Sequence, residues 1–118
     1  MKTKRIKVFE SSIEAKLFLP EGKVYGVQVD GKKICLVRHE QTIYAVHDKC
    51  PHEGYPFSKG YCTKEGELVC PWHKYSFNLQ NGKRTHGIGY SIKPLKVEET
   101  EKGVFVEWPL SWMESFLG

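Results

Sequence analysis

The chain has 118 residues, a length that fits one compact domain and leaves no room for a second domain that binds a nucleotide or an organic substrate. Its formal net charge is +4, but after the first seven positions the basic residues are interleaved with glutamates, which argues against nucleic-acid binding. No apolar run approaches a membrane span and no secretory signal follows the basic N-terminus, so we expect a cytoplasmic protein without membrane association.

A short helix is the first element that the sequence predicts. Ser11 is followed three positions later by Glu14, which is the capping-box pattern, and helix-compatible residues continue as far as Phe18. Because a proline cannot continue a helix, we expect this helix to end before Pro20.

Three strands are predicted to follow the helix. Residues 24–29 and 33–38 are rich in β-forming side chains and flank Asp30-Gly31, a strong signal for a two-residue hairpin turn. Residues 42–47 have the same character. The sequence therefore predicts antiparallel pairing in this part of the chain.

The remainder of the chain is irregular at first and then rich in β-formers. Residues 48–66 hold prolines, glycines and polar side chains without sustained periodicity. Beyond them we expect a turn at Asn81-Gly82, a short helix over 110–117, and strands over 67–70, 75–79, 88–97 and 103–108. Together these elements predict an all-β fold with short helices near its ends.

Two short segments carry the residues with metal-binding chemistry. Cys50 and His52 are separated by one residue, and Cys70 and His73 by two, so each segment supplies one thiol and one imidazole. Structural zinc sites usually place cysteines in one knuckle and histidines in another. In a Rieske centre two histidines replace two cysteines on one of two irons, so each segment can send its cysteine to one iron and its histidine to the other.

This pattern resembles the Rieske family, whose motif is Cys-x-His, a spacer of some fifteen or more residues, and Cys-x-x-His, and the resemblance runs from about 22 to 108. It implies the Rieske fold, in which stacked antiparallel sheets form a base below a small cluster-binding subdomain. We expect a single domain over 1–118, with the cluster-binding part at about 48–78 and the basal β part at 1–47 and 79–118.

The resemblance also implies the cofactor and its ligands. The cofactor is one [2Fe-2S] cluster, with Cys50 and Cys70 on one iron as thiolates and His52 and His73 on the other iron through one ring nitrogen each. A zinc-stabilised interaction module that uses the same four ligands is the alternative outside redox chemistry.

The chain departs from the respiratory members of the family. Those members add two cysteines that bridge the ligand loops, at positions that match Tyr55 and Trp72 here. They also place hydroxyl groups near the cluster at positions that match Tyr75 and Phe77, and Phe77 has none. Fewer hydrogen-bond donors to the cluster sulfurs favour a reduction potential at the lower end of the Rieske range of about −150 to +300 mV. Residues 86–90 match the third loop that shields a Rieske cluster, or form a plain turn.

The remaining thiols and imidazoles are expected to play no part in ligation. Cys35 lies in a β pattern and is expected in the core, and Cys62 is interpreted as a loop thiol without a role. His39, His47 and His86 are interpreted as surface or structural histidines, because the two matched motifs already supply four ligands.

The functional prediction is a Rieske-type ferredoxin that carries one electron from a flavin- or NAD(P)H-dependent reductase to a terminal oxygenase. The chain contains no Gly-rich dinucleotide fingerprint and no accompanying facial triad of two histidines and a carboxylate, so we expect it to turn over no substrate itself. The resemblance leaves a second hypothesis open, the small Rieske subunit of a nitrite reductase.

Overall fold

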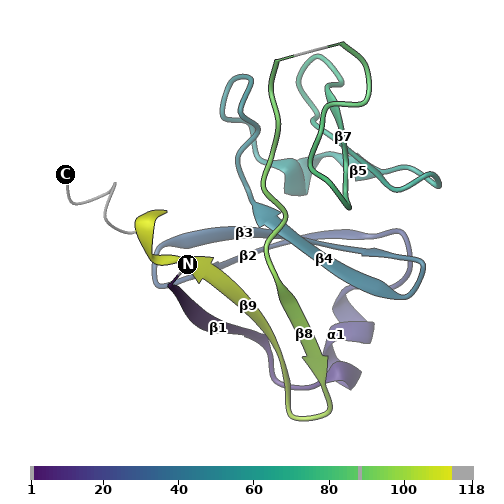
Figure 1. The fold of residues 1–118 in the computed structure, drawn as a ribbon. Coiled ribbons are helices and arrows are strands. Elements are labelled where there is room, and N and C mark those ends of the chain that lie inside the picture. The colour runs from purple at the N-terminus through teal and green to yellow at the C-terminus, as the bar shows by residue number, and fades with distance from the viewer. Residues whose placement is uncertain (1, 88, 113–118) are drawn as a thin grey trace.

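The computed structural model describes residues 2–87 and 89–112 of the chain. Over these residues the strands form three antiparallel sheets of three strands each, in the orders β1-β9-β8, β2-β3-β4 and β5-β6-β7 (Figure 1). This confirms the all-β expectation and the stacking of antiparallel sheets. None of the helices in the described part of the chain is long and apolar enough to cross a membrane.

The first sheet joins the two ends of the chain. It contains β1 (Thr3–Phe9), β8 (Val97–Thr100) and β9 (Gly103–Pro109), with β1 antiparallel to β9. Sequence analysis predicted no strand before the helix, because this segment is strongly basic and its pairing partner lies about a hundred positions away. Only its inward side chains, Ile6 and Phe9, are buried.

The second sheet is the meander that the sequence predicted. It contains β2 (Val24–Val29), β3 (Lys32–His39) and β4 (Thr42–His47), each antiparallel to the next. Asp30 and Gly31 both adopt positive φ, 50° and 77°, as the predicted hairpin turn requires.

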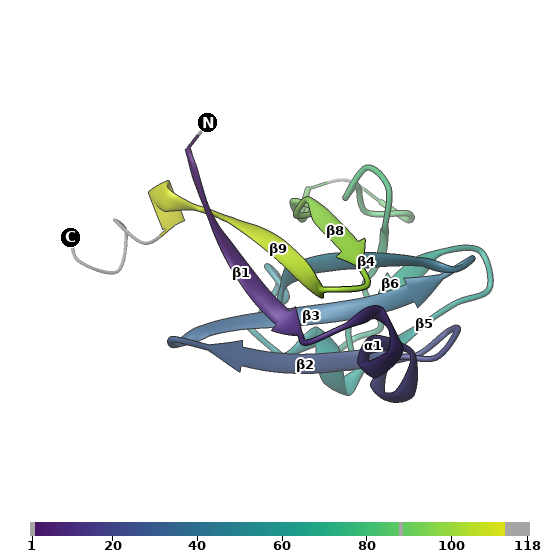
Figure 2. The ribbon, with the colours of Figure 1, turned by 90° about the horizontal axis from the view of Figure 1, so that it is seen from below.

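The predicted N-terminal helix is also confirmed. α1 (Ser12–Phe18) begins after Ser11, whose hydroxyl oxygen accepts a hydrogen bond of 3.1 Å from the Glu14 backbone N–H. Figure 2 shows that β1 leads directly into α1 at the edge of the second sheet. There Ala15 and Leu19 are fully buried and close one end of the core.

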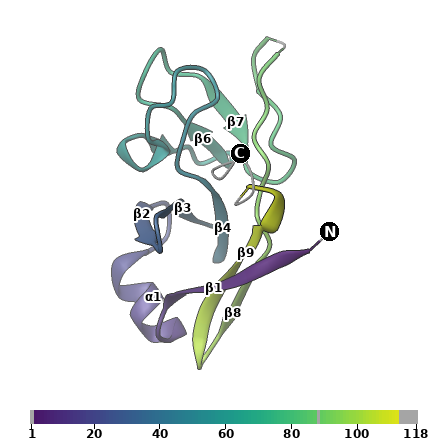
Figure 3. The same ribbon diagram turned by 90° about the vertical axis from the view of Figure 1, so that its left-hand side faces the viewer.

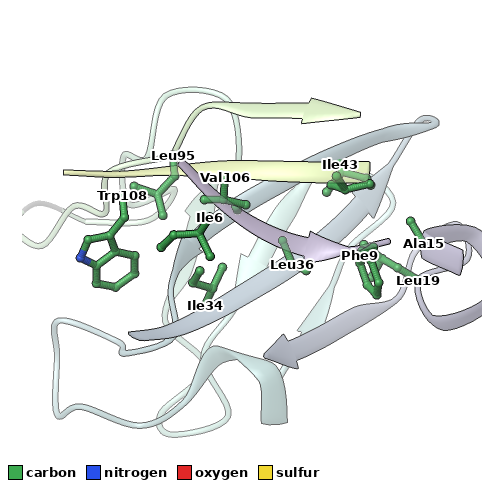
Figure 4. Packing of buried hydrophobic residues seen from close by; sticks show 12 residues of the cluster. Ile6, Phe9, Ala15, Leu19, Ile34, Leu36, Ile43, Leu95, Val106 and Trp108 are labelled. Carbon is green, nitrogen blue, oxygen red and sulfur yellow. The ribbon is translucent and has the colours of Figure 1, made fainter. Parts of the chain in front are cut away.

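The main hydrophobic core lies between the first two sheets and under α1 (Figure 4). Removing these side chains from water is the principal driving force for bringing the two sheets together. Its buried members are Ile6, Phe9, Ala15, Leu19, Ile34, Leu36, Ile43, Ala45, Leu95, Val104, Val106 and Trp108.

The third sheet lies on the opposite side of β2-β3-β4 from the first sheet (Figure 3). It consists of β5 (Tyr61–Cys62), β6 (Glu67–Val69) and β7 (Ser76–Asn78), preceded by the 3₁₀ turn η1 (Phe57–Lys59). A second hydrophobic cluster fills the space between these sheets. Its buried members are Cys35, Val37, Val46, Cys50, Phe57, Leu68, Cys70, Phe77 and Leu79.

The predicted strand over 88–97 is wrong. The described part of this segment is extended but forms only isolated bridges, Lys83 with Ser91 and Ala45 with Leu95, and regular pairing begins at Val97 in β8. Pro94 has no backbone N–H to donate to a ladder, and this interrupts the β pattern.

Two further expectations are met in part. The chain reverses at Asn81-Gly82, with Gly82 at φ 76°, but the return segment forms isolated bridges, such as the one between Phe77 and Arg84, rather than a full strand. Of the helix expected over 110–117, residues 110–112 are helical and the rest lies outside the described residues.

Candidate metal centre

The two predicted ligand segments form loops of the same backbone design. The first loop runs from Cys50 to Tyr55 and the second loop from Cys70 to Tyr75, each with a proline after the cysteine. In the first loop the cysteine N–H donates to the tyrosine carbonyl at 2.8 Å, and in the second loop the equivalent bond is 2.7 Å. Both loops are therefore closed over the same number of residues.

Left-handed backbone conformations allow both loops to turn so tightly. Gly54 adopts φ 77° in the first loop, and Lys74 adopts φ 58° at the same offset in the second loop. His73 precedes Lys74 with φ 62°. Two consecutive L-residues in this region cost of order 1–2 kcal/mol each, and strain of this kind is concentrated at functional sites.

Each loop is anchored to the sheets at its base. Asp48 precedes the first loop, and its carboxylate accepts hydrogen bonds from the Ser58 backbone N–H at 2.8 Å and from the Ser58 hydroxyl at 2.5 Å. Ser58 lies so close to Gly26 of β2 that a Cβ added there would meet it at 2.7 Å. The second loop connects β6 to β7, whose residues Val69 and Ser76 pair directly.

The thiols of Cys50 and Cys70 meet inside the protein. Both residues are fully buried in the second cluster, and the Cys50 side chain contacts the Cys70 thiol. The pKa of the Cys70 thiol is raised to about 11, mainly by burial. A hydrogen bond from the Trp72 backbone N–H lowers this pKa, and the contact with Cys50 raises it further. A bound metal ion reverses this preference, because its positive charge stabilises thiolates.

The imidazoles of His52 and His73 also lie together, on the outer side of the site. Their ring centroids are 5.1 Å apart, with His52 partly buried and His73 exposed. The Nδ1 atom of His52 is buried and has no hydrogen-bond partner in the part of the chain that the structure describes. Buried polar atoms are normally paired, so this nitrogen is available to a ligand or a metal.

Aromatic rings connect the two loops. Trp72 stacks on Tyr55 with centroids 4.9 Å apart and an interplanar angle of 5°, and it also stacks on His73 at 4.9 Å. Tyr55 and Trp72 are the positions that match the bridging cysteines of the respiratory members, so a ring stack links the loops where those proteins have a disulfide. Tyr75 stacks on His52 at 4.1 Å.

A third segment completes the surroundings of His52. The Tyr90 ring meets His52 edge-on at 5.7 Å, so this residue of the segment that matches a shielding loop or a plain turn lies beside the site. The Arg84 guanidinium lies 3.9 Å from the centroid of the Tyr75 ring. Sequence analysis missed Arg84, because the contact is made through a turn and no local pattern marks it.

The other cysteines and histidines have different surroundings. Cys35 is fully buried on β3, as expected for a core residue. Cys62 was expected in a loop, but it lies in β5, paired with Leu68 of β6. It is half-buried, and burial and the charge of Glu21 raise its pKa to about 11. His39 and His47 end strands β3 and β4, and His86 is exposed.

The four predicted ligands thus form two pairs, a buried pair of thiols and an outer pair of imidazoles. In the part of the chain that the structure describes, no group of three or more His, Cys, Asp or Glu side chains is arranged to hold one metal ion. A two-iron centre with sulfur ligands on one iron and nitrogen ligands on the other requires paired donors of this kind.

The chain is similar to known proteins in both sequence and fold. The family model of the Rieske [2Fe-2S] domain matches residues 11–91. The ferredoxin component of the naphthalene 1,2-dioxygenase system of Pseudomonas aeruginosa is 37% identical over 83 residues, which are 68% of this chain and 79% of that protein.

Other relatives differ more in length or sequence. The ferredoxin component of the alkene monooxygenase system of Xanthobacter autotrophicus is 29% identical over 80 residues, 66% of each chain, and only 10% of mouse apoptosis-inducing factor 3 is matched. The ferredoxin of carbazole 1,9a-dioxygenase from Nocardioides aromaticivorans shares the fold, with a TM-score of 0.75, 20% identity, and coverage of 89% of this chain and 98% of that chain.

Proposed function

Because this chain belongs to the Rieske [2Fe-2S] domain family, we propose that Cys50, His52, Cys70 and His73 hold one [2Fe-2S] cluster and that the protein is a one-electron carrier. The observation that carries this proposal is the sorting of the four side chains into a buried thiol pair and an outer imidazole pair. Relatives named as ferredoxin components of oxygenase systems support the carrier role.

The donor set fits the cluster. Cys50 and Cys70 provide thiolates for one iron, and His52 and His73 provide one ring nitrogen each for the other iron. The unpaired Nδ1 of His52 is the nitrogen that needs a partner. When bound, the cluster supplies one-electron chemistry at a potential set by its ligands and their surroundings.

The protein's own residues prepare a contact surface around the outer imidazoles. His73 is exposed, and three partly exposed rings lie beside the histidines, Tyr55 and Trp72 with 39% of their surface accessible and Tyr90 with 41%. Such rings lose little conformational entropy on docking. The partners in this proposal are a flavin- or NAD(P)H-dependent reductase as electron donor and a terminal oxygenase as acceptor, in the cytoplasm.

The cofactor part of the proposal is tested by metal analysis. Anaerobically purified protein should contain two irons and two sulfides per chain, with little zinc, and dithionite should give the low-average-g EPR signal of a nitrogen-ligated cluster. Cys70→Ser should lose the cluster, whereas Cys62→Ser should keep it. Stoichiometric zinc without iron would overturn the assignment and favour the zinc-stabilised interaction module.

The carrier part is tested by electron transfer. The reduced protein should be reoxidised by a terminal oxygenase and re-reduced by a reductase, without consuming an organic substrate when alone. Isolation in a tight complex with a large sirohaem-bearing protein, together with no transfer to an oxygenase, would contradict this and support the nitrite reductase subunit.

A further inference from the structure

A second polar site lies beside the first loop, outside the metal centre. It is a cavity of about 340 Å³ between the β2–β3 turn, the end of β4, the first loop and β9. This volume is within the range of small-molecule sites. The polar side chains that line it belong to Lys32, Lys33, His47, Asp48, Lys49 and Trp108.

Two buried hydrogen-bond donors in this lining lack an adequate acceptor. Trp108 is fully buried, and its Nε1 has no hydrogen-bond partner among the described residues. Figure 4 shows this nitrogen on the side of the ring that points away from the labelled core residues. Lys32 is only 8% exposed, and the one acceptor found for its ammonium group in the described structure is the Asp30 carbonyl, at 3.4 Å.

The other buried cation of the described residues has very different surroundings. Arg38 is 6% exposed, donates to the Leu19 and Gln41 carbonyls, and forms an ion pair with Glu99 at 3.2 Å. A buried charge without such partners is strongly unfavourable. The weakly bonded ammonium of Lys32 therefore indicates a site for an anionic partner.

Most of the formal charges that line the cavity are positive, because three lysines and one carboxylate belong to the lining. Lys33 and Lys49 add two exposed ammonium groups to the lining, which also includes His47, whose ring contacts Trp108 edge-on. The one carboxylate in the lining, Asp48, is already engaged by the N–H and hydroxyl of Ser58. The field inside the cavity is therefore positive.

We propose that this cavity binds a small oxyanion, a carboxylate or a phosphate, with the Lys32 ammonium and the Trp108 indole N–H as its buried donors. The anion contacts the first loop as well as the base, because Lys49 immediately precedes Cys50 and Gly54 also lines the cavity. The proposal does not depend on the cluster, so its failure would leave the electron-carrier proposal intact.

The test is calorimetric titration of the full-length protein, as isolated, with phosphate and separately with acetate, at constant ionic strength set with sodium chloride. We expect one saturable site for at least one of these anions. Lys32→Met keeps the apolar stem without the charge and should weaken binding by about tenfold or more, since hydrogen bonds to charged groups contribute about 1.5–3 kcal/mol. Lys102→Met removes an exposed lysine of the β8–β9 turn and should leave binding unchanged.

Melting temperatures provide a second measurement that does not require tight binding. The bound anion should raise the melting temperature of the wild type. In buffer without these anions, Lys32→Met should melt no lower than the wild type, because it removes an unpaired buried charge, and it should not respond to the anion. Equal responses of Lys32→Met and Lys102→Met, or a response to sodium chloride alone, would show general screening and overturn the proposal.

Discussion

At the residue scale, ring contacts surround the outer imidazoles of His52 and His73. Tyr75 stacks on His52, with ring centroids 4.1 Å apart, and the Arg84 guanidinium lies 3.9 Å from the Tyr75 centroid. A positive charge therefore lies close to the proposed ligand His52. A guanidinium over an aromatic face is favourable by about 0.5–1 kcal/mol at an exposed site and more where it is desolvated. The charge is thus positioned to act on the electron that the site accepts.

Replacing Arg84 should change the reduction potential. Arg84→Gln should shift the midpoint to more negative values by on the order of tens of millivolts, because a nearby cation stabilises the added negative charge. Arg84→Lys keeps a positive charge and should restore most of the potential. A redox titration followed by visible absorption measures both variants, and an unchanged midpoint in Arg84→Gln would contradict this role.

His47 should make stability depend on pH. Burial, then the charge of Lys49, lowers its pKa below 6.5, with Asp48 opposing and Lys33 adding to the decrease. The unfolded chain therefore binds a proton at a higher pH than the folded chain, so stability is complete above about pH 6.5 and decreases as the pH falls toward the folded pKa.

Melting curves in phosphate-free buffer at about pH 7.5 and about pH 5.5 measure this dependence. The wild type should lose stability on acidification, and His47→Gln should lose less. An equal loss in both proteins would assign the effect to other groups.

At the element scale, β3 lies between the two hydrophobic clusters and contributes side chains to both. Its side chains alternate, with Ile34 and Leu36 in the core against the first sheet and Cys35 and Val37 in the cluster under the third sheet. A strand that is buried on both faces usually has a continuous run of apolar residues, and residues 34–37 of β3 form such a run. The hydrophobic cluster that contains Cys50 and Cys70 therefore packs on one face of β3.

The turn at Gly82 should be an essential support for the segment that carries Arg84. A Cβ added at Gly82 would lie 1.8 Å from the Ile92 carbonyl oxygen, whereas at Gly22 it would meet nothing within 4 Å. Both glycines have φ close to 80°. Gly22→Ala therefore reports the left-handed strain alone, about 1–2 kcal/mol, and Gly82→Ala should cost at least twice as much. Thermal or urea unfolding compares them, and equal losses would show that the turn adapts.

At the scale of the whole molecule, the chain contains two hydrophobic clusters with different structural roles. The first hydrophobic cluster stabilises the base, where the first and last described strands pair side by side. The second hydrophobic cluster stabilises the two ligand loops. In the proposed holoprotein, the [2Fe-2S] cluster joins two loops that contact each other through their side chains.

Removal of the [2Fe-2S] cluster should selectively increase the mobility of the two ligand loops. Hydrogen exchange on chelator-treated protein should show faster exchange at the Cys50 and Cys70 amides, whose hydrogen bonds close the loops, and little change in β1 and β9. Uniform loss of protection would show that the base depends on the cluster and would contradict a division at about 48–78.

The sequence by itself determined what depends on neighbouring residues or on a short motif. The cap at Ser11, the turn at Asp30-Gly31, the meander and the Cys/His pairs are local signals, and the structure bears out the elements among them. Identification of the Cys/His pairs as ligands remains the proposal made here.

Tertiary structure decided what depends on partners far apart in the chain. The pairing of β1 with β9, the interrupted strand around Pro94, and the contact of Arg84 with Tyr75 have no local signal. The same is true of the cavity around Lys32, because its lining comes from four separate segments. Packing and long-range pairing are properties of the folded chain, and a linear pattern does not show which distant residues will meet.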